Sequence, residues 1–207
     1  KVPLVSATGS TRMGRDVGPR LAKRFARAVL ELGGNNAGIV CPTADLDMAL
    51  RAIAFGAMGT AGQRCTTLRR LFVHDSVYDT LVPRLKKAYE SVSVGNPLET
   101  SSLVGPLIDK AAFDAMQKAL KEATAHGGKV TGGKRVENGH PDAYYVHPAL
   151  VEMPKQVAPV TEETFAPILY VMKYSDFDAV LDEHNAVGAG LSSSIFTRDL
   201  QESERFL

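Results

Sequence analysis

The chain has 207 residues, of which 44% are hydrophobic and 23% charged, and its formal net charge is +1 at pH 7. This balance is typical of an ordinary globular protein, and the near-neutral charge gives no general electrostatic footprint for nucleic acid. No apolar run approaches the ~18 residues that a membrane-spanning helix needs. From the charge and from this absence, neither nucleic acid nor a membrane is an expected partner.

Both ends of the sequence indicate an excerpt from a longer protein. The first residue is Lys1 rather than Met, no signal segment follows it, and residues 1–7 read as a strand already under way. At the other end, residues 199–207 read as a helix cut in mid-course.

The two cysteines, Cys41 and Cys65, form no recognisable disulfide framework. This favours a reducing compartment, either the cytoplasm or the mitochondrial matrix. No Cys/His cluster has the spacing of zinc ligands, so no metal site is predicted.

Strand and helix patterns alternate along the chain, and this alternation is the main evidence for the fold class. The first half predicts a strand at residues 3–7, a helix-like stretch to about residue 27 that Gly18 and Pro19 interrupt, a strand at 37–41, a helix capped by Asp45, and a strand at 68–74. The second half predicts helices around residues 77–88, 113–123 and 176–185, and strands at 129–131, 149–152, 168–174 and 191–197. Repeated β-then-α units predict an α/β fold with a largely parallel sheet flanked by helices.

A glycine-rich turn between the first strand and the first helix is a candidate phosphate-binding site. Residues 8–14 read Thr-Gly-Ser-Thr-Arg-Met-Gly, and free backbone N–H groups at such a junction can point at an anion. Thr11 stands where the usual dinucleotide fingerprint has its second glycine. A plain structural turn is therefore the alternative interpretation.

Cys65 is the candidate nucleophile. It follows a predicted helix, lies beside small residues and comes directly after the cation Arg64, a setting in which a thiol can be accessible and partly activated. A buried packing cysteine is the alternative, and it is the interpretation for Cys41, which ends an apolar strand.

Several charged residues are candidates either for a catalytic role or for an ordinary place on the protein surface. Glu31 lies in an apolar stretch that ends in two glycines, where an acid is costly unless paired or used, so it is a candidate general base. By themselves, Glu162 and Glu163 read as solvated loop acids. The basic pairs at 69–70 and 86–87 read as strand-edge and helix-surface charges.

Together these blocks resemble the aldehyde dehydrogenase superfamily in content, order and spacing. Glu31-Leu-Gly-Gly34 is followed by Gly62-Gln-Arg-Cys65 and then by Glu162-Glu-Thr-Phe-Ala-Pro167, while residues 8–14 resemble that family's variant cofactor turn. The resemblance covers essentially the whole chain. Within the superfamily, the blocks are most similar to the branch that oxidises α-aminoadipic semialdehyde.

The resemblance implies NAD(P)-dependent oxidation of an aldehyde to its carboxylic acid. Cys65 would form a thiohemiacetal and then a thioester, and Glu31 would activate the water that hydrolyses the thioester. Arg64 would bind a substrate carboxylate, with an internal ion pair as the alternative. NAD is the implied cofactor, with NADP as the alternative, and the residues implied to bind it are Gly9, Ser10, Gly14, Leu32, Gly33, Glu163 and Phe165.

The resemblance also implies an organisation. Residues 1–30 would be the C-terminal piece of the NAD-binding domain, and residues 31–207 a catalytic domain that is incomplete at its C-terminus. The full-length parent is expected to be a homo-oligomer, a tetramer, acting on a small-molecule aldehyde. Two alternatives stay open, another aldehyde such as betaine aldehyde and a non-catalytic, crystallin-like protein of the same fold. The 207 residues alone are expected to be inactive.

Overall fold

The computed structural model describes residues 2–137 and 139–207, so Lys1, the first residue of the segment 1–7 that reads as a strand already under way, lies outside the described residues. In chain order the elements are β1 (Leu4–Thr8), α1 (Thr11–Ala22), β2 (Arg27–Glu31), β3 (Asn36–Val40), α2 (Leu46–Met58), the 3-10 turn η1 (Gly59–Gly62), β4 (Leu68–His74), α3 (Asp75–Ser91), α4 (Lys110–Ala125), β5 (Lys129–Gly132), β6 (Ala149–Glu152), β7 (Ile168–Tyr174), α5 (Phe177–Asn185), β8 (Ser193–Phe196) and α6 (Leu200–Phe206).

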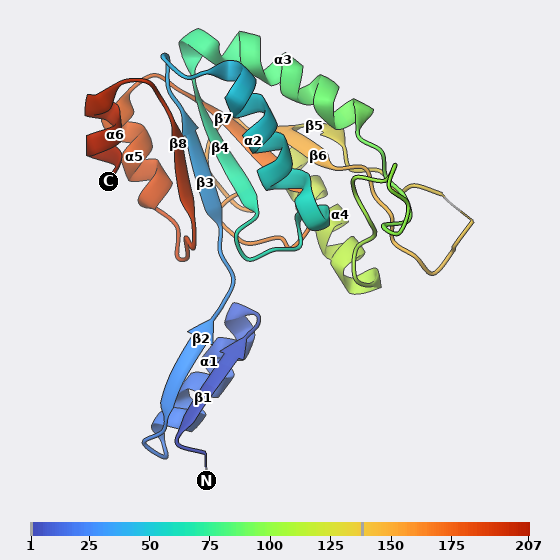
Figure 1. The fold of residues 1–207 in the computed structure, drawn as a ribbon, viewed down its shortest axis with the longest axis vertical. Coiled ribbons are helices and arrows are strands. Elements are labelled where there is room, and N and C mark those ends of the chain that lie inside the picture. Colours follow the sequence, from blue (N-terminus) through green and yellow to red (C-terminus); the bar gives the residue numbers. More distant parts are fainter. Residues whose placement is uncertain (1, 138) are drawn as a thin grey trace.

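The chain begins with a small unit made of β1, α1 and β2. The two strands pair in parallel, with Thr8 opposite Glu31, so their carboxyl ends lie at one edge. Figure 1 shows this unit below the rest of the protein, joined to it by the segment between β2 and β3. A helix follows β1 as predicted, but its predicted end near residue 27 is wrong. The helix ends at Ala22, and a turn in which Phe25 has a φ of 57° reverses the chain into a strand.

The remaining six strands form one sheet in the order β5-β6-β7-β4-β3-β8. Four of its five pairings are parallel and only β5–β6 is antiparallel, which confirms the predicted largely parallel sheet. The predicted strands at 68–74, 149–152 and 168–174 coincide with β4, β6 and β7. Asp45 caps α2 as predicted, because its carboxylate accepts hydrogen bonds from the N–H groups of Asp47 and Met48.

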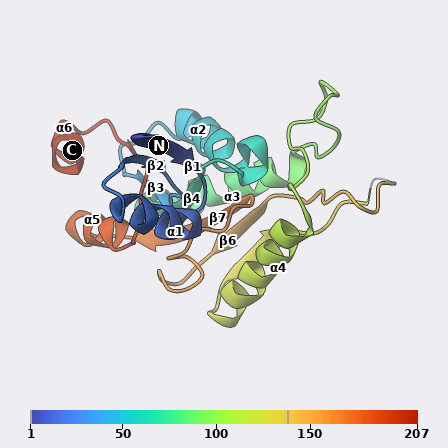
Figure 2. The ribbon, with the colours of Figure 1, turned by 90° about the horizontal axis from the view of Figure 1, so that it is seen from below.

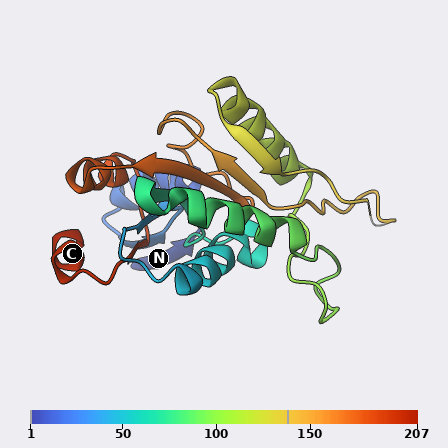
Figure 3. The same cartoon turned by 90° about the horizontal axis from the view of Figure 1, so that it is seen from above.

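Helices cover both faces of this sheet. The chain passes from β3 to β4 through α2 and from β7 to β8 through α5, and these two crossovers run in opposite directions along the sheet. Because such crossovers are right-handed, the two helices lie on opposite faces. Figures 2 and 3 show α2 and α3 on one face and α4 and α5 on the other. The core lies in these layers, where β3, β4 and β7 are almost wholly buried. Within the described residues, no helix is long and apolar enough to cross a bilayer.

Candidate active site

A cavity of about 660 Å³ lies between the small unit and the six-stranded sheet. Residues 8–10 and 32–33 line it from the carboxyl ends of β1 and β2. Residues 63–66 line it from the segment that leads into β4, and Glu163 and Phe165 from the segment that leads into β7. Four stretches that are far apart in the sequence therefore meet around one space.

Cys65 reaches this cavity through a strained turn. After α2, Thr60, Ala61 and Gly62 have φ values of 56°, 53° and 67°, so three consecutive residues adopt the left-handed conformation. Gly62 cannot be replaced without a clash, because a Cβ there would lie 2.3 Å from the carbonyl oxygen of Ala166. The turn brings the half-buried Cys65 to the cavity wall, as expected for an accessible nucleophile.

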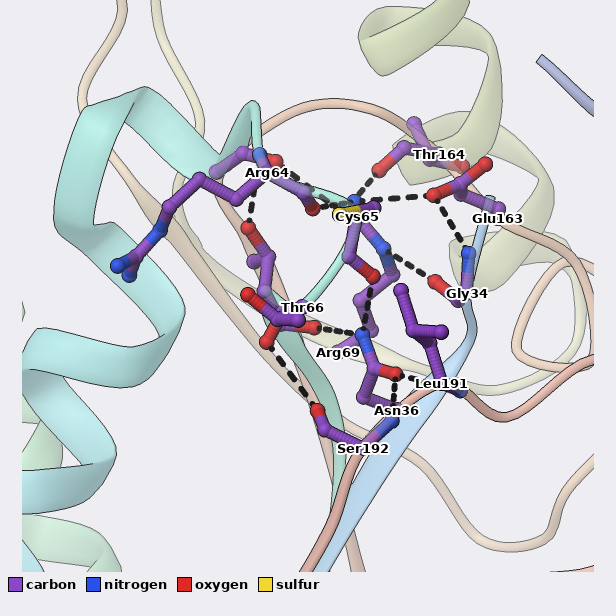
Figure 4. Close-up of polar contacts among 12 residues, drawn as sticks. Gly34, Asn36, Arg64, Cys65, Thr66, Arg69, Glu163, Thr164, Leu191 and Ser192 are labelled. Atoms are coloured by element: carbon purple, nitrogen blue, oxygen red, sulfur yellow. Dashed lines mark hydrogen bonds and ion pairs between the residues drawn. The ribbon is translucent and has the colours of Figure 1, made fainter. Parts of the chain in front are cut away.

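Asn36, which the sequence analysis did not single out, holds the chain on both sides of Cys65. Its buried amide donates to the carbonyl oxygens of Cys65 (2.7 Å) and Thr67 (2.8 Å), and its own oxygen accepts from the N–H groups of Leu191 and Ser192 (Figure 4). The N–H of Cys65 donates to no other group among the described residues. Two consecutive asparagines at the start of a buried strand were the signal that could have identified this role.

Arg69 and Arg70 are buried, so the prediction that they are strand-edge surface charges is wrong. They lie on β4, a central strand, and are 2% and 1% exposed. The guanidinium of Arg69 is not solvated. Instead, backbone carbonyl groups accept hydrogen bonds from most of its N–H groups. The carbonyl oxygens that accept from it are those of Gly34 (3.1 Å), Gly62 (3.3 Å), Thr164 (2.6 Å) and Arg64 (3.0 Å).

Glu163 and the glycine pair 33–34 pack closely together. Oε1 of Glu163 accepts from the N–H of Gly34 (3.1 Å) and lies 3.4 Å from Nη2 of Arg69. A Cβ on Gly33 would come within 2.0 Å of Oε2 of Glu163, so any side chain at this position would displace the Glu163 carboxylate. Oε2 itself has no hydrogen-bond partner among the described residues and belongs to a residue that lines the cavity.

Two predicted site residues lie outside the cavity lining. Glu31 ends β2 and is exposed, so the cost of burial that singled it out does not apply, although its neighbours Leu32 and Gly33 line the cavity. Gly14 is buried within α1, where a Cβ would lie 2.4 Å from Cδ1 of Leu32. Because Gly14 has no side chain, α1 can pack closely against Leu32, the residue that follows β2.

Ser10 and Arg64 line the cavity and also make local contacts. Ser10 caps α1 by accepting from the N–H of Met13 (3.1 Å). The guanidinium of Arg64 lies 5.2 Å from the ring centroid of Phe55 and donates to that residue's carbonyl oxygen (3.2 Å). Its Nε is buried without a hydrogen-bond partner, and no carboxylate of the described residues pairs with it.

Cys41 is a packing cysteine, as predicted. It is 0% exposed, and burial raises the pKa of its thiol to about 12. The described residues contain no group of three or more His, Cys, Asp or Glu side chains that could hold a metal ion.

The sequence profile of the aldehyde dehydrogenase family matches residues 1–207. Mouse α-aminoadipic semialdehyde dehydrogenase is 47% identical over 208 aligned residues, which cover 100% of this chain and 38% of the mouse protein. The predicted similarity to that branch, known as antiquitin, is thereby confirmed.

Solved structures of aldehyde dehydrogenases also match this chain. The crystal structure of lactaldehyde dehydrogenase from Escherichia coli has a TM-score of 0.94 and 34% identity, covering 99% of this chain and 43% of that one. A 3,6-anhydro-L-galactose dehydrogenase in complex with NAP has a TM-score of 0.94 and 32% identity, covering 98% and 43%. The chain thus spans about two fifths of the length of these relatives.

The two thiols should differ sharply in reactivity. In the folded chain at pH 8, iodoacetamide should alkylate Cys65 at least about tenfold faster than Cys41, because only Cys65 lines a cavity and only the thiolate reacts. Peptide mass mapping over time measures both rates, and denaturant should make them similar. Equal rates in the folded chain would contradict the assignment of Cys65 as the accessible thiol.

Proposed function

Because the chain belongs to the aldehyde dehydrogenase family, we propose that it carries the nucleophile of an enzyme that oxidises an aldehyde to its carboxylic acid. The observation that carries the proposal is that Cys65 shares one cavity with Glu163, Phe165 and the turn at residues 8–10. Since the chain spans 38% of its mouse relative, this activity belongs to a protein of the relatives' length.

In this proposal the thiolate of Cys65 attacks the aldehyde carbon and forms a C–S bond, which places a negative charge on the former carbonyl oxygen. The N–H of Cys65 has no other acceptor among the described residues, so it is available to stabilise that charge. Loss of hydride from the tetrahedral carbon then restores the C=O bond and leaves a thioester on Cys65.

The acceptor proposed for the hydride is the nicotinamide of NAD, and the cavity has features that fit such a nucleotide. The turn at residues 8–10 precedes the N-terminus of a 12-residue helix, where unpaired N–H groups favour a phosphate. The free Oε2 of Glu163 is an acceptor suited to a ribose hydroxyl, and the 44% exposed ring of Phe165 offers a flat apolar surface. In this proposal, β1, α1 and β2 end the nucleotide-binding domain.

Glu31 is proposed to complete the reaction. Its carboxylate takes a proton from water, and the resulting hydroxide attacks the thioester carbonyl, which breaks the C–S bond and releases the acid and the thiolate. Support comes from its place directly before Leu32 and Gly33, two residues of the cavity wall, and from an exposure that gives its carboxylate access to water.

Arg64 is proposed to select the substrate. It lines the cavity one residue before the nucleophile, and no carboxylate among the described residues neutralises it. A substrate with its own carboxylate would supply the missing counter-charge. Together with the relatives named α-aminoadipic semialdehyde dehydrogenase, this favours a semialdehyde that bears a carboxylate.

Replacement of the nucleophile tests the proposal directly. In a protein of the relatives' length that carries this chain, Cys65→Ala should abolish both the first turnover and the steady rate of NADH formation, because no C–S bond can form. Cys41→Ala is the matched control and should keep most of the activity, since that thiol is buried and does not line the cavity. Dehydrogenase activity that survives Cys65→Ala would remove Cys65 from the mechanism.

Glu31→Gln should separate thioester formation from its hydrolysis. In stopped-flow measurements we expect a burst of about one NADH per site to persist, while the steady rate falls by about 10²-fold or more, because the general base is lost. Glu162→Gln, a nearby exposed acid outside the cavity lining, serves as the control and should leave both phases unchanged. An unchanged steady rate in Glu31→Gln would exclude the base role.

Arg64→Ala should change specificity rather than chemistry. The KM for a semialdehyde that carries a carboxylate should rise about tenfold or more, whereas a neutral aldehyde of similar length should change less than about twofold. Steady-state kinetics with the two substrates measure the difference, and Arg64→Lys should retain part of the selectivity. Equal effects on both substrates would show that Arg64 is structural.

A further inference from the structure

The guanidinium of Arg69 contacts residues in or next to three of the four segments that line the cavity. The five groups that accept hydrogen bonds from Arg69 belong to three stretches: residue 34, residues 62–64, and residues 163–164. These stretches contain or adjoin the glycine pair, the turn before the nucleophile and the carboxylate proposed to hold the ribose. Figure 4 shows Arg69 between Cys65, Gly34 and Glu163.

The neighbouring Arg70 shows that burial alone does not produce this arrangement. It lies on the same strand with similar exposure, but its side chain donates to the carbonyl oxygens of Asn35 and His184 and to the side chain of Gln156. None of these three partners lines the cavity of Cys65. The two arginines therefore form a natural pair for comparison.

We propose that Arg69 is a positioning residue that fixes the Glu163 loop against the Cys65 turn, so that one side chain holds the nucleotide-binding carboxylate in place beside the thiol. The proposal rests on the proposed function. Two bridges made by the guanidinium carry the proposal. Nη1 donates to the carbonyl oxygens of Gly62 (3.3 Å) and Thr164 (2.6 Å). Nη2 donates to the carbonyl oxygen of Arg64 (3.0 Å) and to Oε1 of Glu163 (3.4 Å). A rigid planar fork can span these acceptors, whereas a single ammonium cannot.

The charge of Arg69 adds a second contribution. Burial lowers the pKa of its guanidinium, and the negative charges of Glu163 and Cys65 oppose that shift. The guanidinium also lies 5.4 Å from the ring centroid of Phe165. A cation so placed attracts negative charge on the sulfur atom of Cys65.

The test uses two variants of a protein of the relatives' length that carries this chain. Arg69→Lys keeps the charge but loses the fork, so the KM for NAD should rise about five- to twentyfold while kcat changes less than about threefold. The rate of Cys65 alkylation at pH 8 should stay at its wild-type value. Arg69→Gln loses both, so the KM for NAD should rise and the rate of Cys65 alkylation at pH 8 should fall about threefold or more.

Arg70→Lys is the matched control for a perturbed buried arginine, and it should change neither the KM for NAD nor the rate of Cys65 alkylation. An unchanged KM in Arg69→Lys, or equal effects of Arg69→Lys and Arg70→Lys, would overturn the proposal. If Arg69→Gln does not fold, the separation of KM from kcat in Arg69→Lys decides alone. A wild-type protein that forms no NADH with any aldehyde would instead refute the proposed function, a result distinct from these.

Discussion

The organisation of the site depends on burying one guanidinium. A charged group taken out of water must find acceptors, and Arg69 finds them in carbonyl groups of loops that approach the sheet from different parts of the chain. Those carbonyl groups in turn need donors, because irregular loops lack the partners that strands provide. The guanidinium and the loop carbonyl groups therefore satisfy each other's hydrogen-bonding needs, and neither could be buried alone.

The cavity lies between two different kinds of sheet edge, and the need to satisfy loop backbone groups applies to one of them. The small unit contributes the carboxyl ends of β1 and β2, the edge at which parallel α/β sheets commonly bind ligands. The large sheet contributes the opposite kind of edge, since Cys65 and Phe165 precede the amino ends of β4 and β7. Asn36 and Arg69, at the amino ends of β3 and β4, fasten the loops at this edge, as the irregular backbone there requires.

The sequence predicted most of the large sheet because its strands are rich in aliphatic and aromatic residues, and β4, β6 and β7 were found residue for residue. It did not predict β2, whose side chains are mostly exposed and which therefore lacks the pattern of a buried strand. Nor did it predict the burial of Arg69. The acceptors of Arg69 lie up to 95 positions away, and no local pattern of charges can reveal carbonyl groups that tertiary structure turns inward.

The remaining cost in the site is the left-handed turn at residues 60–62. Two of its residues carry a Cβ, and each such residue costs about 1–2 kcal/mol relative to the right-handed conformation. Hydrogen bonds at the two ends of the turn offset this strain. The amide of Gln63 donates to the carbonyl oxygens of Thr60 and Pro106 and accepts from the N–H of Ile108, while Arg69 holds Gly62. Because the strain is held from both ends, Cys65 is presented by a turn that cannot relax into the helix before it.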